Sequence, residues 1–304
     1  MENLNWHTAS MEELELLQKT AVNNGVFANN YSAVNSIIYA KKYDSQIAVQ
    51  DGWIFEKYYA GGDSTFAFPH RIDGKTDGVE GALSLLMSEA EKSGCPCVFR
   101  NITEEEKDLL SKNFTPAKIE EASDLSDYIY SKEDLAELPG SKYSKKRNHI
   151  NQFRKKYSDF RLELITPQNF KTVCELEKKW FSESSESLDL QQEAEIICAA
   201  LKNFEEFSRT AGMKGGILFA DGEPTAFCLS STLSPDVTDV HFEKCLSAFA
   251  RDGGYAVINN EYAKTIETKY INREEDLGIE GLRKAKRSYY PEILLPKYNV
   301  YFQQ

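Results

Sequence analysis

Three residues that could transfer protons lie close together in the second half of the chain. Asp239, His241 and Glu243 occupy alternate positions of a strand-like segment. Successive side chains of a strand point to opposite faces, so these three would share one face, with Val240 and Phe242 on the other. Glu243 and His241 are therefore candidates for a general base or for recognition of a substrate amine. The alternative is a strand whose polar face simply lies in water.

A glycine turn follows this segment and precedes a predicted helix over residues 257–266. The turn contains Arg251, Gly253, Gly254 and Tyr255. Free N–H groups and the positive end of the helix dipole bind phosphate at such a place. The residues fit Arg-x-x-Gly-x-Ala, a degenerate form of the pyrophosphate loop of GNAT acyltransferases. The turn could therefore hold a coenzyme A thioester, although an ordinary connecting turn explains it equally well.

A basic segment lies near the middle of the chain. Pro139 and Gly140 interrupt regular structure, and no helix breaker follows, so a helix is predicted to begin near Ser141. Four residues at helical spacing would form its buried face: Tyr143, Ile150, Phe153 and Tyr157.

Cations also fall on or near that buried face. Arg147 and Arg154 lie within it, Lys146 lies at its edge, and Asn148 lies on the flank. A desolvated charge needs a partner. The partners could be acidic side chains of the protein or phosphates of a ligand, because guanidinium groups suit phosphate oxygens.

The C-terminal region combines an acidic loop with a short basic helix. Asp276 lies in the loop, and Arg283 and Lys286 lie in the helix. Lys286 is predicted to lie among the buried residues Leu282, Ala285 and Tyr289. It could reach an anion or a carboxylate of the loop, or extend past its neighbours to water. Tyr289 could offer its hydroxyl to a leaving group or pack in the core.

Composition narrows the function classes. The 304 residues carry a net charge of −12, which argues against DNA or general nucleic-acid binding. No apolar run approaches the roughly 20 residues that span a bilayer, and the N-terminus lacks a signal peptide, so a cytoplasmic protein is expected. The six cysteines are expected to be reduced, and the four histidines form no ligand-like pair, so no metal site is expected.

The order of predicted elements suggests a duplication. Each half places helices before a hairpin with an Asp-Gly turn, at Asp51-Gly52 and Asp221-Gly222, and another helix after it. A strand over 127–130 is predicted to close the first half. The expected domains are residues 1–135, a basic linking helix over 136–158, and residues 159–304, which would carry the candidate site.

Several of these motifs together resemble the DUF2156 family, which includes the cytosolic C-terminal domain of bacterial phosphatidylglycerol lysyltransferases. The matching residues are Asp127-Tyr128-Ile129-Tyr130, Leu138-Pro139-Gly140, Lys142-Tyr143, the run 145–153, Glu243-Lys244, Gly254-Tyr255 with Asn259, Glu275-Asp276, Gly278, Gly281-Leu282-Arg283 and Lys286. The resemblance implies an α/β fold of two tandem GNAT-like acyl-CoA N-acyltransferase units, with mixed central sheets flanked by helices. In the lysyltransferase branch it implies transfer of an aminoacyl group from charged tRNA to a lipid hydroxyl.

The leading hypothesis is a cytosolic acyl or aminoacyl transferase of this kind. Glu243 or His241 would position or deprotonate the acceptor, and Tyr289 would protonate the leaving group. Backbone N–H groups near Gly253 and Gly254 would hold donor phosphate, with further anion binding by Arg147, Arg283 and Lys286. The alternatives are an acyl-CoA-dependent N-acetyltransferase with one functional half, and a non-catalytic binder of tRNA or an anionic membrane surface.

Overall fold

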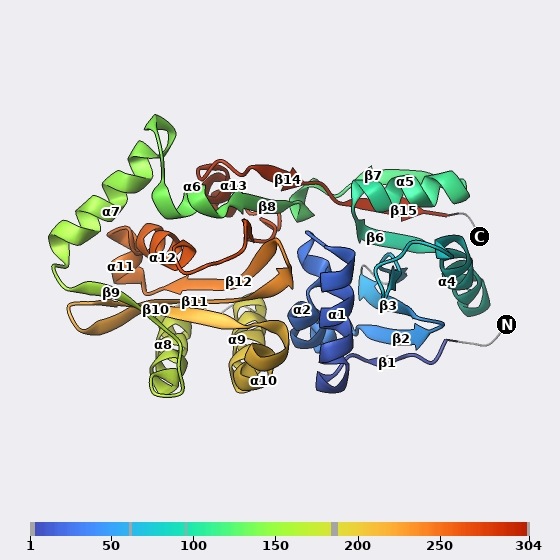
Figure 1. Cartoon of the computed structure of the whole chain (residues 1–304), viewed down its shortest axis with the longest axis horizontal. Helices are drawn as coiled ribbons and strands as arrows, with labels where there is room; N and C mark the ends of the chain where they lie inside the picture. The colour runs from blue at the N-terminus through green and yellow to red at the C-terminus, as the bar shows by residue number, and fades with distance from the viewer. Residues whose placement is uncertain (1–3, 61–62, 95, 184–187, 303–304) are drawn as a thin grey trace.

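Two β-sheets lie side by side in the computed structural model of the chain, which describes residues 4–60, 63–94, 96–183 and 188–302 (Figure 1). Helices α1 and α2 stand between the two sheets. Within these residues, no helix is both long and apolar enough to cross a bilayer. The thiols of Cys97, Cys174, Cys198, Cys228 and Cys245 are free. Cys95 lies outside the described residues.

The first sheet has eight strands, in the order β1-β2-β3-β4-β6-β15-β7, with β5 paired to β3. Their bounds are β1 (His7–Thr8), β2 (Gln46–Gln50), β3 (Trp53–Ala60), β4 (Asp63–Phe66), β5 (His70–Arg71), β6 (Val98–Ile102), β7 (Lys118–Glu121) and β15 (Tyr298–Tyr301).

The second sheet has seven strands, in the order β14-β8-β13-β12-β11-β10-β9. Their bounds are β8 (Asp127–Ser131), β9 (Phe160–Leu164), β10 (Lys214–Ala220), β11 (Glu223–Ser234), β12 (Val237–Cys245), β13 (Tyr270–Asn272) and β14 (Ile293–Leu295).

Helices cover both sheets, and short 3-10 turns lead into some of them. The helices are α1 (Leu14–Asn24), α2 (Ala33–Ile38), α3 (Ala40–Tyr43), α4 (Val79–Ser93), α5 (Glu104–Asn113), α6 (Lys132–Glu137), α7 (Ser144–Lys156), α8 (Phe170–Glu183), α9 (Leu188–Lys202), α10 (Phe204–Ala211), α11 (Ser247–Arg251), α12 (Gly254–Ala263) and α13 (Glu280–Arg287). The 3-10 turns are η1 (Met11–Glu13), η2 (Asn29–Tyr31), η3 (Ser123–Leu125) and η4 (Ser141–Tyr143). Helices α9 and α10 are separated by Asn203.

The two sheets share one strand order, and this supports the predicted duplication. Counted from β1 and from β9, the second, third and fourth strands of each sheet are antiparallel neighbours. The fourth strand then pairs with a parallel fifth strand, β4 with β6 and β12 with β13. Both Asp-Gly turns have two positive φ angles: Asp51 52° and Gly52 81°, Asp221 49° and Gly222 83°. That conformation matches the twist of the strands that a two-residue hairpin joins.

The halves exchange one strand each, so the predicted domain boundaries are wrong at two places. Strand β8 does not close the first half; it pairs with β13 and β14 in the second sheet. Strand β15 returns from the C-terminal region and pairs with β6 and β7 in the first sheet. Neither sheet is therefore complete within residues 1–135 or 159–304.

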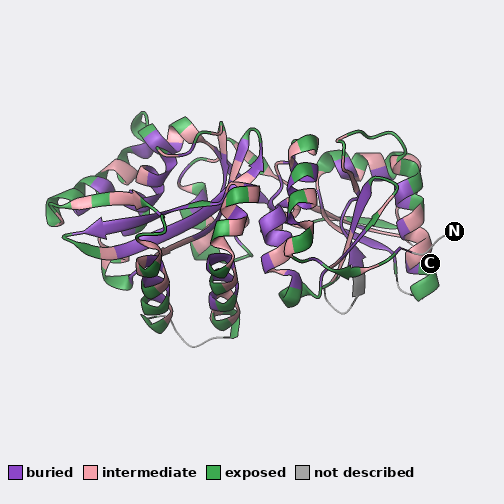
Figure 2. Ribbon diagram, turned by 60° about the horizontal axis from the view of Figure 1, so that its bottom comes forward, coloured by how far each residue is buried: buried purple, intermediate pink, exposed green. Residues whose placement is uncertain are grey.

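A shared core also joins the halves. Leu14 and Leu17 of α1 and Val34 of α2 pack in one buried cluster with residues of α8, α9 and α10 and of the second sheet. Figure 2 shows buried residues along the strands of both sheets and on the helices between them. Helices of the first half therefore cover part of the second sheet, which carries the candidate site residues.

Candidate functional site

The candidate site lies where two parallel strands separate. The ladder between β12 and β13 runs from Val237 opposite Tyr270 to Asp239 opposite Asn272. Beyond this point β12 continues to Cys245, while β13 ends and the chain turns into the loop 273–279. Functional groups gather at the carboxyl ends of parallel strands, because side chains and backbone are not enclosed there by a further ladder.

A β-bulge in β12 overturns the predicted alternation. Leu229 of β11 lies opposite Phe242, but the next residue, Ser230, lies opposite Val240, so His241 is the extra residue of the bulge. An extra residue reverses the facing of the strand on one side of it. Val240 and Phe242 consequently pack in different cores instead of sharing one face.

The two predicted catalytic residues are therefore separated. Glu243 lies opposite Cys228, on the face that α12 covers. His241 and Asp239 lie on the other face, where Glu274 meets Asn35 of α2. The expectation that Asp239, His241 and Glu243 share one face is thus wrong, and the structure divides them into two clusters.

The cluster on the α12 face is centred on an ion pair. Glu243 Oε1 accepts a hydrogen bond from Arg273 Nη2 at 3.1 Å, and both side chains are largely buried. The amide of Asn259 in α12 lies against both groups; with its oxygen turned to Arg273 it accepts from Nη1 at 3.2 Å and from Nε at 3.3 Å. The carboxylate and the guanidinium are thus held in a fixed orientation next to the gap between the strands.

Aromatic rings and a lysine complete this cluster. The Arg273 guanidinium carbon lies 5.1 Å from the centre of the buried Tyr289 ring, and Lys146 Nζ of α7 lies 3.6 Å from the same centre. Burial, and then the charge of Arg273, lower the pKa of Lys146 to about 8. An amine with that pKa exchanges protons near neutral pH. Burial raises the pKa of Tyr289, which keeps its hydroxyl protonated.

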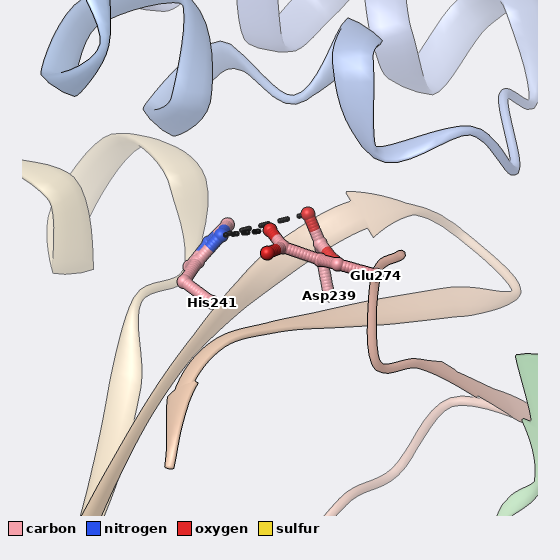
Figure 3. Close-up of side chains that lie close together, drawn as sticks. All are labelled: Asp239, His241 and Glu274. Carbon is pink, nitrogen blue, oxygen red and sulfur yellow. Dashed lines mark hydrogen bonds and ion pairs between the residues drawn. The ribbon is translucent and has the colours of Figure 1, made fainter. Parts of the chain in front are cut away.

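The second cluster contains His241, Asp239 and Glu274 (Figure 3). His241 Nδ1 lies 3.5 Å from Asp239 Oδ2 and 3.4 Å from Glu274 Oε1. On its other side, His241 Nε2 and Ser231 Oγ share a hydrogen bond of 2.8 Å. Asn35 Nδ2 donates to Glu274 Oε1 at 2.9 Å, so the cluster also connects the second sheet to α2.

The glycine turn differs from the predicted phosphate loop. Helix α11 separates it from β12, and Gly253, with a φ of 100°, lies directly before α12. A Cβ atom at Gly253 would lie 3.0 Å from the carbonyl oxygen of His149, so α7 lies against the turn. Asp252 Oδ2 accepts hydrogen bonds of 2.6 Å from Lys156 and Tyr157 of the same segment. Of the other predicted residues, Gly254 is buried, whereas Arg251 and Tyr255 are exposed.

The predicted anion-binding residues of α7 mostly have partners within the protein. Arg147 donates to the backbone carbonyls of Leu138 and Gly140, so it fixes the turn before the helix. Arg154 pairs with Glu261 at 3.3 Å, and Asn148 is exposed. The buried face is as predicted: Tyr143, Ile150 and Phe153 are buried and Tyr157 is half-buried.

The predicted residues of the C-terminal region fix the loop 273–279. Asp276 accepts two hydrogen bonds of 2.8 Å from Arg283 and one of 2.6 Å from Tyr128, and these bonds, those from Arg283 foremost, lower its pKa to about 2. Lys286 is buried and donates to the carbonyls of Arg273 and Glu275, whereas Ala285, predicted to be buried, is exposed. We therefore assign structural roles to Asp276, Arg283 and Lys286.

Sequence reasoning missed several members of both clusters. Arg273 and Glu274 come directly after β13, and their position at the carboxyl end of a parallel strand was the signal available for them. Lys146 was placed at the edge of the buried face of its helix, without a partner. No local pattern shows that Tyr289 and Lys146 meet, because 143 positions of the chain separate them.

Comparison with known proteins assigns the chain to a family. The model of the phosphatidylglycerol lysyltransferase C-terminal family matches residues 27–301. The chain belongs to this family. The family is named for a lysyltransferase, so the chain is related to aminoacyl transferases, and the predicted family and α/β fold class are confirmed.

Three individual relatives show how far the similarity extends. A Bacteroides thetaiotaomicron protein of unknown function is 31% identical, with a TM-score of 0.89 over 99% of this chain and 100% of that one. L-PGS from Bacillus licheniformis shares the fold, with a TM-score of 0.64 and 13% identity over 96% and 91% of the two chains. An uncharacterized protein of Mycoplasmoides gallisepticum is 22% identical over 58% of this chain, and the match spans 56% of that relative.

Proposed function

We propose that the chain transfers an aminoacyl group from a charged tRNA to a hydroxyl or amine acceptor at the cluster of Glu243, Arg273, Tyr289 and Lys146. The observation that carries the proposal is the oriented Glu243–Arg273 pair beside a lysine of lowered pKa, at the point where β12 and β13 separate. Family membership supports the reaction class.

Each group has a task that its position suits. Glu243 accepts the proton of the acceptor as that atom attacks the carbonyl carbon of the aminoacyl ester. Arg273 and Lys146 stabilise the negative charge that develops on the carbonyl oxygen. The Tyr289 hydroxyl protonates the ribose oxygen as the ester bond breaks, and the proton taken up by Glu243 then returns to Tyr289. The products are the aminoacylated acceptor and free tRNA, so no further reactant is required.

Charged tRNA is favoured over a coenzyme A thioester as the donor. Helix α7 lies against the glycine turn, and the Asp252 carboxylate is held next to it. Both features disfavour a pyrophosphate at this place, because the first limits access and the second repels an anion. The acyl-CoA N-acetyltransferase therefore becomes the second candidate, and the Arg251-to-Tyr255 turn is its proposed site.

The proposed acceptors follow the family name. The name of the family mentions the lysyl group and phosphatidylglycerol. A phospholipid hydroxyl is therefore the first acceptor to test, and a small amine is the second. Contact with a membrane surface would then be peripheral, through exposed cations of α7 such as Lys145.

The proposal is tested by mixing the purified protein with tRNA charged with radiolabelled amino acids, one at a time, and phosphatidylglycerol vesicles. We expect label to enter the lipid extract or a small-amine product for at least one amino acid. The same assay with labelled acetyl-CoA and an amine library tests the second candidate. Label transfer from acetyl-CoA alone would replace the proposal by that candidate. Salt-sensitive binding of tRNA or vesicles without transfer from either donor would leave only the non-catalytic binder.

A further inference from the structure

The cluster of His241, Asp239 and Glu274 lies on the face of β12 opposite the proposed transfer site. One ligand-type atom from each of the three residues lies within 4.8 Å of the other two, and no other group of this kind is found among the described residues. Asp239 and the His241 side chain are fully buried, and the Glu274 side chain is 15% exposed. Figure 3 shows the three side chains directed at one another from β12 and the loop after β13.

The distances in this cluster fit the ligands of one metal ion, and they allow only one long hydrogen bond, between His241 Nδ1 and Glu274 Oε1. His241 Nδ1 lies 3.5 Å from Asp239 Oδ2 and 3.4 Å from Glu274 Oε1. An N–H···O hydrogen bond usually spans about 2.7–3.2 Å. Ligand atoms at about 2.0–2.2 Å from a tetrahedral Zn²⁺ lie about 3.3–3.6 Å apart. One Nδ1 hydrogen could in any case satisfy only one of the two carboxylates.

Asp239 supplies a second, independent observation. Neither oxygen of its carboxylate has a hydrogen-bond partner within the described residues, although the side chain is completely buried. A buried carboxylate requires compensation by hydrogen bonds, a cation or a proton. The nearby buried carboxylate of Asp127 has compensation, because Lys297 Nζ donates to it at 2.7 Å. No hydrogen bond compensates Asp239, so its burial requires a cation or a proton.

The histidine is oriented as a metal ligand would be. The hydrogen bond between its Nε2 and Ser231 Oγ leaves Nδ1 directed at the two carboxylates. Metal-binding histidines characteristically use their second nitrogen for such a bond, which fixes the ring. Asn35 adds a further oxygen: its Oδ1 is buried and unpartnered, while its Nδ2 donates to Glu274.

We propose that Asp239, His241 and Glu274 bind one divalent transition-metal ion, with Zn²⁺ as the best match to one imidazole and two carboxylates. A water molecule or the Asn35 oxygen would supply the fourth ligand. The ion connects β12, the loop after β13 and helix α2. Because Glu274 is adjacent to Arg273, the bound ion positions the loop from which Arg273 reaches Glu243. This inference revises the expectation of no metal site, because Glu274 comes from a segment distant in sequence from Asp239 and His241.

The test uses the purified full-length protein, stripped with a chelator and then titrated with Zn²⁺ and, separately, Mn²⁺. Calorimetry and elemental analysis after dialysis are expected to give one Zn²⁺ per chain, bound more tightly than Mn²⁺. The variants Asp239→Asn and His241→Gln should weaken Zn²⁺ binding at least 100-fold. Ser231→Ala should weaken it by about 10- to 100-fold, because the ring loses its orienting bond.

The matched control is His7→Gln, which removes an exposed histidine paired with Glu13 at 3.2 Å and should leave Zn²⁺ binding unchanged. Circular dichroism identifies any variant that fails to fold, and Glu274→Gln then replaces it. Absence of stoichiometric binding to the wild type would overturn the proposal and leave a proton as the compensation for Asp239. Equal binding by wild type and cluster variants would also overturn it, since the ion would then lie elsewhere. Metal content is measured without a transferase assay, so this outcome is independent of the proposed function.

Discussion

His241 and Glu243 are two positions apart on β12, yet they face opposite sides of the second sheet. The bulge at His241 produces this arrangement, because it adds one residue between Phe242 and Val240. One strand therefore serves two clusters: Glu243 with Arg273 under α12, and His241 with Asp239 and Glu274 under α2. The loop after β13 contributes adjacent residues, Arg273 and Glu274, to the two clusters.

The first prediction concerns the Glu243–Arg273 pair. Glu243→Gln keeps the size of the side chain but removes the proton acceptor, so we expect turnover of aminoacyl transfer to fall by about 10²–10⁴-fold. Arg273→Lys should also lower turnover, because a lysine cannot reproduce the guanidinium geometry at Glu243 and Asn259. Initial rates under saturating donor measure both effects.

Glu193→Gln is the control for this prediction. Glu193 pairs with Lys244, the residue after Glu243, at 2.6 Å on the opposite face of the sheet. Its loss disturbs an ion pair of β12 without touching the proposed site, so turnover should change less than threefold. If Glu243→Gln and Glu193→Gln have the same turnover, the assignment of Glu243 as proton acceptor is wrong.

The second prediction concerns the pH dependence of Lys146. Its pKa is lowered to about 8, and the proposed role requires the protonated form, so turnover should fall as the pH rises through about 8, approaching tenfold per unit. Lys146→Arg keeps a positive charge above that pH and should move the alkaline limb upward. Rates between pH 6.5 and 9.5, corrected for spontaneous ester hydrolysis, measure the limb. An identical alkaline limb in both proteins would exclude Lys146 as the titrating group.

Much of the fold could be predicted because its signals are local. The Asp-Gly turns specify two hairpins, and the buried face of α7 follows from helical spacing. The exchange of β8 and β15 could not be predicted, because the residue pattern of a strand does not indicate which sheet the strand joins. The strand over 127–130 was predicted to close the first half, and only its pairing with β13 and β14 shows that it joins the second sheet.

The candidate site was predictable in position but not in detail. The residues of β12 were found because polar groups along one face of a strand are unusual, whereas Arg273 and Glu274 of the C-terminal loop were missed. The predicted orientation of the β12 side chains was wrong because a single extra residue reverses the alternation, and no residue type marks the bulge. Arg147 and Arg283 were interpreted as ligand-binding residues, whereas backbone carbonyls satisfy Arg147 and the carboxylates of Asp276 and Asp124 satisfy Arg283. Partners so distant in sequence cannot be identified from charge alone.

The third prediction concerns the acid stability given by Asp276. Its folded pKa of about 2 lies below the usual value of an aspartate, so the carboxylate stabilises the folded state above about pH 4, and this contribution is lost as the pH falls towards 2. Asp276→Asn should lower the free energy of unfolding at pH 7 by about 2–4 kcal/mol, because Arg283 and Tyr128 lose a charged acceptor. Urea unfolding at pH 7 and at pH 3 should show a smaller difference between the two proteins at the lower pH. A difference that does not change with pH would contradict this linkage.

The fourth prediction follows from the exchanged strand β15. Val300 is completely buried in the core of the first half, although it lies almost at the end of the chain. Val300→Ala should lower the free energy of unfolding by about 2 kcal/mol, because it removes buried methyl groups and leaves a cavity. Ile119→Ala on the paired strand β7 is the control; Ile119 lies directly opposite Val300 but is 44% exposed, so it should cost less than about 1 kcal/mol. Equal losses would mean that β15 does not contribute to that core in solution.

The last prediction concerns the buried pair of Lys297 and Asp127, which joins the exchanged strands to η2. Lys297 Nζ donates to Asp127 Oδ1 at 2.7 Å, and Asp127 Oδ2 accepts from the Asn29 backbone N–H at 2.8 Å. Lys297→Met should lower the free energy of unfolding by about 3–5 kcal/mol, because it leaves a buried carboxylate without its cation. The double variant with Asp127→Asn should recover most of that loss, since no charge then remains unpaired. Lys118→Met, which breaks an exposed pair with Glu120, should cost less than about 1 kcal/mol. If the double variant is less stable than Lys297→Met alone, the energetic cost does not come from the uncompensated charge.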